Sequence, residues 1–136
     1  MAHFSDHYEN KIIDHMLRNQ AFTPPGTIYL ALFTADTGLE ADNPTAEVSG
    51  GAYARQAFTL TAASAGASSN SADIEFPEAT ANWGTITHLA IVDHLSNSNW
   101  GTDVHVLMWG SLAAPKTINT GDTLRINLGD LDVSVA

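Results

Sequence analysis

The sequence predicts a mainly β fold, an antiparallel β-sandwich or barrel, with one amphipathic helix near the N-terminus. Three observations lead to this class. Apolar residues recur at helical spacing in one segment, about residues 5–19. From residue 26 onward, short alternating or apolar stretches are separated by turns rich in Gly, Asn and Asp. With 136 residues, the chain is expected to form a single domain over residues 1–136 around one core.

The helix is expected to begin at Ser5 or Asp6, either of which can cap it, and to end before the Thr-Pro-Pro-Gly turn at 23–26. Its apolar stripe consists of Tyr8, Ile12, Ile13, Met16 and Leu17. We expect this stripe to dock on the sheet of its own domain, because a short helix gains most of its stability from such packing. The alternative is a helix that packs on a neighbouring subunit.

The rest of the chain is expected to form seven or so strands. The stretch 27–34 is apolar on both faces, which is typical of a central strand covered on both sides. The other expected strands are short and bounded by turns: 52–60, 72–76, 85–93, 104–112, 123–128 and 131–135. Two long loops are expected at 36–51 and 95–102, and a flexible connection of small polar residues is expected at 61–71.

Four large side chains are predicted to form the structural core. Trp83 stands beside Gly84 at the start of a strand, and a buried indole ring removes more surface from water than any aliphatic side chain. The predicted core residues are Trp83, Phe76, Ile86 and Trp109.

Composition restricts the partners that the protein can bind. The formal charge of −10, from 15 acidic and 5 basic residues, argues against binding to nucleic acid or to an anionic membrane surface. The absence of cysteine excludes a disulfide framework. No apolar run approaches the ~20 residues of a membrane span, and no signal-peptide pattern is present. We therefore expect a protein made in a cytoplasm, with no membrane partner.

The histidines give a weak indication of a metal site. His88, Asp93, His94 and His105 could approach one another if the strands that carry them pair. However, the tight His-x-His or His-x-x-x-His spacing of many metal sites is missing. We therefore prefer a structural His88 and an exposed His94, and we predict no metal and no cofactor.

The acidic segment and the serines give no stronger sign of chemistry. Asp36, Glu40, Asp42 and Glu47 lack the ordered spacing of a calcium loop, so a solvated acidic loop is the preferred interpretation. No Gly-x-Ser-x-Gly or phosphate-binding motif is present. We predict that the protein is not an enzyme.

A family resemblance is carried by the segment Phe-Pro-x-Ala-Thr-x-x-Trp-Gly-Thr-Ile-Thr-His at 76–88. Matching blocks lie on either side of it, at 14–17, 22–25, 28–33, 48–56, 109–110 and 116–124. With these blocks the chain resembles small virion proteins of tailed bacteriophages, a family often labelled tail fibre proteins. It departs from the family pattern at 93–103, where a short turn has become longer.

The resemblance implies a non-enzymatic structural protein of the virion that is made in the host cytoplasm and binds other virion proteins. We favour a capsid decoration (cement) protein on the outer shell, because coiled-coil heptads, repeats or a shaft that would give a fibre its reach are missing. The alternative is a tail-fibre or receptor-binding component that recognises a bacterial surface glycan. A scaffolding or host-interaction role outside the particle is a third possibility.

Large aromatic residues predict self-association. Tyr8, Phe22, Trp83, Trp100 and Trp109 are more than one sandwich core of this size needs to bury, and exposed apolar patches mark contacts. We therefore predict a homo-oligomer, a trimer by analogy with decoration proteins.

The lengthened segment is the predicted partner contact. It places Trp100 among small polar residues, with Asn97, Asn99 and Asp103 close by, which suits polar contacts around one aromatic anchor. The alternative is a hairpin tip whose Trp100 folds back on its own sheet.

Overall fold

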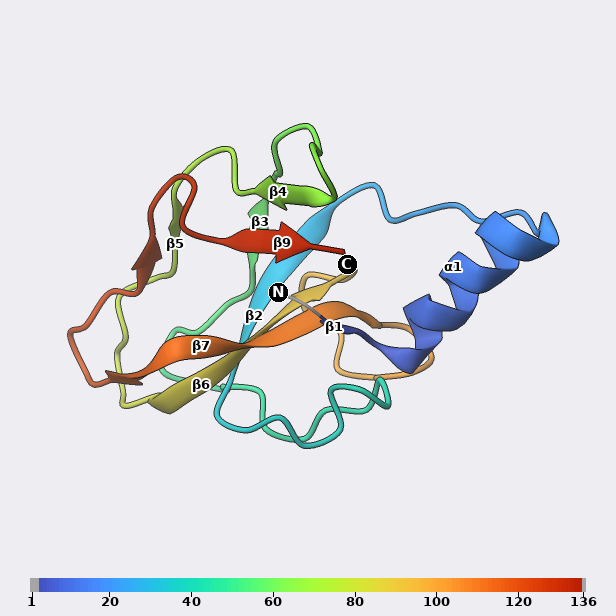
Figure 1. Ribbon diagram of the computed structural model, residues 1–136. Coiled ribbons are helices and arrows are strands. Elements are labelled where there is room, and N and C mark those ends of the chain that lie inside the picture. The colour runs from blue at the N-terminus through green and yellow to red at the C-terminus, as the bar shows by residue number, and fades with distance from the viewer. Residues whose placement is uncertain (1–2, 136) are drawn as a thin grey trace.

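A five-stranded antiparallel sheet forms the centre of the protein in the computed structural model, which describes residues 3–135 (Figure 1). The strand order is β1-β7-β6-β2-β3. These strands are β1 (His3–Phe4), β2 (Ile28–Phe33), β3 (Gln56–Phe58), β6 (Gly84–Val92) and β7 (Val106–Ile118). Two small sheets complete the β structure: β4 (Ala67–Ser69) pairs with β9 (Asp132–Ser134), and β5 (Ile74–Glu75) pairs with β8 (Arg125–Ile126). The mainly β class with one N-terminal helix is confirmed, and the described strands form no closed barrel.

Both faces of the central sheet are covered, each by its own apolar cluster. Leu30 and Leu32 of β2 point to one face, where side chains from the two small sheets pack on them. Ala31 and Phe33 point to the opposite face, where Leu39 of the long loop covers them. Because alternate side chains of β2 enter two different apolar clusters, the stretch 27–34 is apolar on both faces.

Three of the four predicted core residues lie in the first of these clusters. Phe76, Trp83 and Ile86 are 1%, 6% and 0% exposed. The Trp83 indole N–H donates to the Gly51 carbonyl oxygen at 2.8 Å. Trp109 differs: it is half-buried, and its N–H donates to the Glu40 carboxylate at 2.8 Å.

Helix α1 (Asp6–Arg18) has caps at both ends. Ser5 caps the start, while Asn19 ends the helix in the left-handed conformation and donates its N–H to the Asp14 carbonyl oxygen. Ser5 itself is fully buried, and its hydroxyl donates to the Val106 carbonyl oxygen of β7. One serine therefore both begins the helix and anchors it to the sheet.

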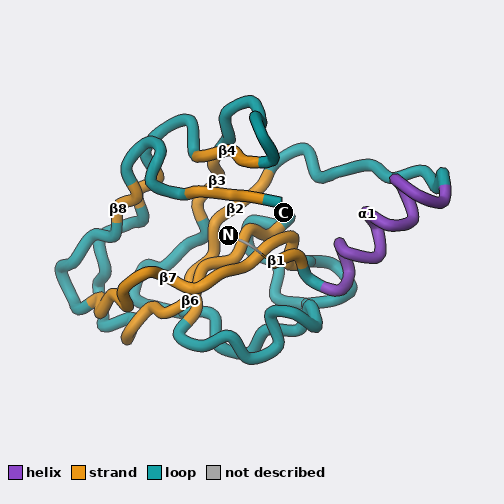
Figure 2. The backbone as a smooth tube through the Cα atoms, viewed as in Figure 1, coloured by secondary structure: helices purple, strands orange, loops and turns teal. Residues whose placement is uncertain are grey.

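The prediction that the stripe of α1 docks along its own sheet is wrong beyond the first turns. Among the helix residues only Tyr8 is buried, while Ile13, Met16 and Leu17 are 51%, 71% and 80% exposed. The helix leaves the body at an angle, and an extended connection of residues 19–27 returns to β2 (Figures 1 and 2). Proline fixes φ and restricts the preceding residue to extended conformations, so Pro24 and Pro25 hold this connection open.

Several strand boundaries differ from those predicted. The sequence misses β1, a two-residue strand that precedes the helix, and it misses β4, which lies inside the expected loop at 61–71. β7 continues to Ile118, six residues past the predicted end, because its distal part pairs with the start of β6. These short or extended pairings depend on partners distant in sequence, which local periodicity does not report.

Candidate functional site

Arg55 connects the two long loops of the molecule. Its guanidinium donates to both carboxylate oxygens of Glu47 in the 36–51 loop, at 2.7 and 2.8 Å. It also donates to the carbonyl oxygen of His94, in the lengthened 93–103 segment, at 2.9 Å. Arg55 is 6% exposed, so this bidentate pair is largely shielded from solvent. The loops are therefore held in a fixed relation to each other.

Tyr53 supports the same carboxylate. Its hydroxyl donates to Glu47 at 2.8 Å and accepts the Leu32 backbone N–H at 3.1 Å. Burial, and then the adjacent Glu47 charge, raise the pKa of Tyr53 well above its usual value, so the hydroxyl remains a donor. The interpretation of 36–51 as a solvated acidic loop is therefore wrong for Glu47 and for Asp42, which is 5% exposed.

An open groove of about 440 Å³ lies between these loops. Its lining includes Glu47, Ser49, Tyr53, Arg55, Ser96 and Ser98. Hydroxyl and charged groups held by ordered backbone are suited to hydrogen bonding with a polar ligand. The sequence did not single out Arg55, and it gave Glu47 only as part of an acidic loop; the available signal was one arginine within an otherwise uncharged strand pattern at 52–60.

Trp100 folds back on its own domain. The centre of its ring lies 6.3 Å from that of Phe33, and the Arg55 guanidinium carbon lies 4.8 Å from the Trp100 ring centre. It is half-buried in this position. The structure therefore favours the folded-back alternative over a free aromatic anchor.

The polar residues predicted to contact a partner hold one another in place. The Asn99 side-chain amide donates to the Asp103 carboxylate at 2.8 Å, and its backbone N–H donates to the Asn97 side-chain oxygen at 2.7 Å. Asn99 and Asp103 are exposed, whereas Asn97 is half-buried. A partner contact at this tip stays a prediction.

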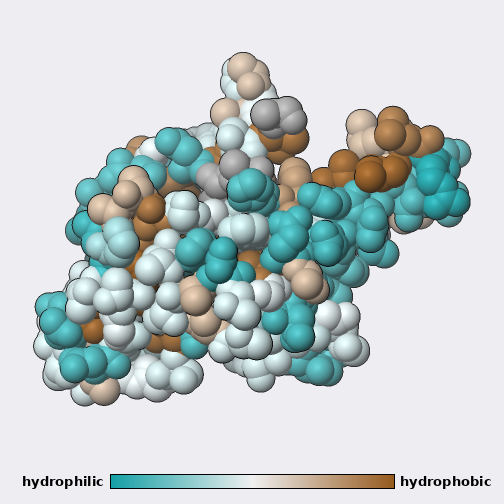
Figure 3. Space-filling view, turned by 60° about the horizontal axis from the view of Figure 1, so that its bottom comes forward, coloured by the Kyte–Doolittle hydropathy of each residue, from teal (hydrophilic) through white to brown (hydrophobic). Residues whose placement is uncertain are grey.

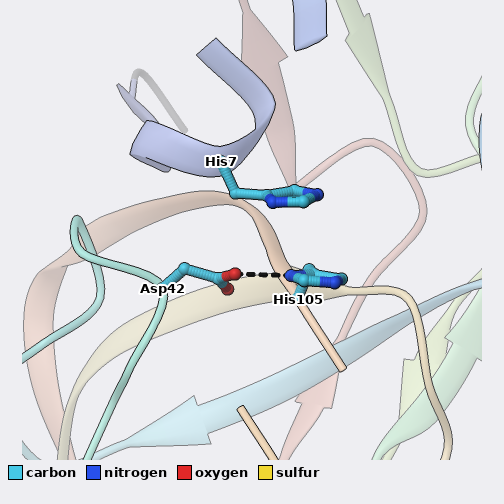
Figure 4. A group of neighbouring side chains, drawn as sticks. All are labelled: His7, Asp42 and His105. Atoms are coloured by element: carbon cyan, nitrogen blue, oxygen red, sulfur yellow. Dashed lines mark hydrogen bonds and ion pairs between the residues drawn. The ribbon is translucent and has the colours of Figure 1, made fainter. Parts of the chain in front are cut away.

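A second cluster of polar side chains lies where the helix meets the sheet (Figure 4). The Asp42 carboxylate pairs with His105 Nδ1 at 2.5 Å and accepts the Val106 N–H at 2.6 Å. The His7 ring, from the first turn of α1, stacks on the His105 ring at 3.8 Å with an angle of 10° between the ring planes. Burial, followed by repulsion from His105, lowers the pKa of His7.

This cluster has metal-binding residue types but lacks metal-binding geometry. A ligand atom from each of His7, Asp42 and His105 lies within 4.8 Å of the others. Histidine binds zinc along the ring plane at about 2.0–2.1 Å. Two nearly parallel rings stacked at 3.8 Å direct their lone pairs along separate planes, so the nitrogens do not converge on one ion. The cluster instead fastens the helix to the 36–51 loop and to β7.

The histidines and aspartate considered from the sequence are not assembled into one site. The candidate ligand groups of the described residues include neither His88 nor His94. His88 lies beside the Thr87 hydroxyl at 2.8 Å, and His94 accepts the Ser96 and Asn97 N–H groups. Asp93 accepts the His105 N–H at 2.7 Å. These are structural roles within loops and strands.

The family match covers almost the whole fold. Residues 3–134 match the family described as podophage GP4 fiber I protein gp80. The chain belongs to this family. A comparison with curated proteins gives no match. The resemblance to tailed-phage virion proteins is confirmed, and this member of the fiber I family is a phage structural protein.

In this fiber I family protein, no helix among the described residues is both long enough and apolar enough to cross a membrane. The exposed surfaces available for contact include the groove between the loops and the projecting helix with its returning connection.

Proposed function

We propose that this protein is a non-enzymatic structural subunit of a tail fibre in a tailed-phage virion, where it binds other virion proteins. The observation that carries the proposal is the match of residues 3–134 to a podophage fibre protein family. This match favours the tail-fibre alternative over the capsid decoration role that the sequence alone suggested. A place on the shell, and a trimer, stay predictions.

Reach is a property of the assembled fibre rather than of each subunit. A fibre can gain length by joining compact subunits through surface contacts. The helix that projects from this protein exposes apolar side chains suited to such a contact.

We further propose that the groove between the loops contacts a glycan on the bacterial surface. Its hydroxyl groups come from Ser49, Ser96 and Ser98, and the buried Arg55 keeps both walls in place. Binding sites are commonly carried by loops that a rigid scaffold positions. A sugar with many hydroxyl groups is recognised by hydrogen bonds and needs no positive charge, which fits a protein with a formal charge of −10.

The position in the virion can be tested by counting copies in purified particles and labelling the protein with gold-conjugated antibody. A tail-fibre subunit should be present in small numbers, with gold at the tail. Hundreds of copies, with gold distributed over the shell, would refute the fibre role and support decoration.

Glycan contact can be tested by substituting a residue in the groove. Ser98→Trp should obstruct the groove and reduce binding to extracted host-surface polysaccharide by roughly tenfold or more. Ser134→Trp, at an exposed serine of β9 outside this groove, is the control and should bind as wild type does. Equal binding by the wild-type protein and Ser98→Trp would refute a glycan site in this groove.

A further inference from the structure

Residues 6–27 form an arm that is attached to the body at both ends. The arm consists of α1 and the extended connection, and it projects beside the sheet (Figure 1). At its base, Ser5 donates its N–H to the Leu107 carbonyl oxygen at 3.1 Å. Phe22 in the returning segment contacts Tyr8 and His15 of the helix, with ring centres 6.0 Å apart in each pair. The two legs of the arm therefore support each other, and of the helix only the first turns pack on the body.

The tip of the arm exposes apolar side chains that no part of the described chain covers. Met16 and Leu17 are 71% and 80% exposed, and Ile13 is 51% exposed. Apolar residues gather on this projecting segment in Figure 3. An isolated helix of 13 residues is only marginally stable in water, and packing of its apolar face normally supplies the missing stability. The tip therefore has the properties of a surface that another molecule covers.

The base of the same arm borders an apolar groove of about 210 Å³. One wall is formed by the arm, through Tyr8, Phe22 and Pro25, and the other by the body, through Leu60 and Met108. The side chains that line the groove are apolar apart from the Tyr8 hydroxyl, and that hydroxyl is engaged with Asp93 at 3.1 Å. A concave apolar surface of this kind is suited to unbranched or branched aliphatic side chains.

Charge favours contact between the tip and the body of another copy. The outer part of the arm, residues 10–19, carries Lys11 and Arg18 against the single carboxylate of Asp14. The remainder of the chain carries the other three cations and all the other carboxylates, which makes the body strongly acidic. A weakly basic tip is attracted to an acidic body, whereas two bodies repel each other.

We propose that the arm tip of one copy inserts Met16 and Leu17 into the apolar groove at the base of the arm of a second copy. Because the tip lies farther out along the arm than the groove, two antiparallel arms can satisfy both contacts at once around a two-fold axis. Such self-association does not depend on the position of the protein in the virion.

Solution mass of the purified full chain provides the first test. Wild type should associate as its concentration rises. Leu17→Gln combined with Met16→Gln should weaken the association roughly 10,000-fold, about tenfold for each lost apolar contact, because the two-fold axis repeats both insertions. Leu128→Gln, at a leucine that is 63% exposed outside the arm, is the matched control and should associate as wild type does. A wild-type chain that stays monomeric at all concentrations would overturn the proposal.

Disulfide trapping identifies the surfaces that meet, and the chain contains no native cysteine to interfere. One chain carries Leu17→Cys, and a second chain, made larger by a tag, carries Leu60→Cys. The two chains are mixed and oxidised, and the products are separated by size without reductant. A mixed disulfide should form much faster than in the control mixture, where Leu128→Cys replaces Leu17→Cys. Equal rates would overturn the proposal, as would association that requires another virion protein. Neither result would bear on the copy number by which the fibre role is tested.

Discussion

Replacement of Trp83 by alanine tests how much of the stability depends on one aromatic cluster. The ring is 6% exposed and meets Tyr53 edge-on at 5.6 Å and Phe76 at 6.4 Å. Trp→Ala in a core costs about 3–5 kcal/mol, and the Gly51 carbonyl would also lose one of its two hydrogen bonds, at about 1 kcal/mol, while it keeps the one from the Thr80 N–H. The expected loss is therefore about 4–6 kcal/mol.

This loss is comparable to the whole stability of many domains, which is about 5–15 kcal/mol. We expect Trp83→Ala to be insoluble or molten, or to unfold at a much lower urea midpoint than wild type. Trp83→Phe separates the two contributions, because it keeps most of the ring packing and removes the N–H donor. The half-buried Trp109→Ala should cost less than Trp83→Ala. A soluble Trp83→Ala with wild-type urea stability would refute the assignment of Trp83 to the core.

Three further predictions concern the loops and the helix base. Glu47→Gln should lower the free energy of unfolding by about 3 kcal/mol in urea titrations, because it leaves the buried Arg55 charge without its partner; the exposed Arg18→Gln should change it by less than about 1 kcal/mol. Because the pKa of His7 is lower in the folded protein than in the unfolded chain, His7 of the unfolded chain is protonated first as the pH falls. The contribution of neutral His7 to stability is therefore present above pH 6.5 and declines below it. Thermal unfolding between pH 7.5 and 5 should therefore show a smaller decline in His7→Asn than in wild type, and identical declines would contradict this. Deletion of 96–99 should leave the domain folded by circular dichroism but weaken attachment to the particle or to host cells, and unchanged attachment would contradict the contact role.

The sequence predicts those features that depend on local pattern. The apolar run at 27–34 specifies a buried central strand, and Trp83 beside Gly84 specifies a core position. The helix is also specified by its spacing and its Ser5 cap. However, amphipathicity reports that a helix has an apolar face, and it does not report which surface covers that face.

The features that the sequence does not predict depend on contacts between distant residues. Asp42 meets His105 only because the 36–51 loop crosses the start of β7. The position of Trp100 against Phe33 likewise depends on the path of a lengthened turn. Periodicity and composition contain no information on such contacts, so the sequence suggested a solvated acidic loop and left Trp100 open between a partner contact and a position on its own sheet.

The attachment of the arm at both ends has a mechanical consequence. A force applied at the tip divides between β1 and β2. Two described residues of β1 pair with β7, whereas β2 pairs with both β3 and β6. The edge strand can peel away one pair at a time, whereas the central strand must break two ladders together. Tension on the tip should therefore detach β1 and open the base of the arm before it disturbs β2. The body then stays folded while the arm extends away from it.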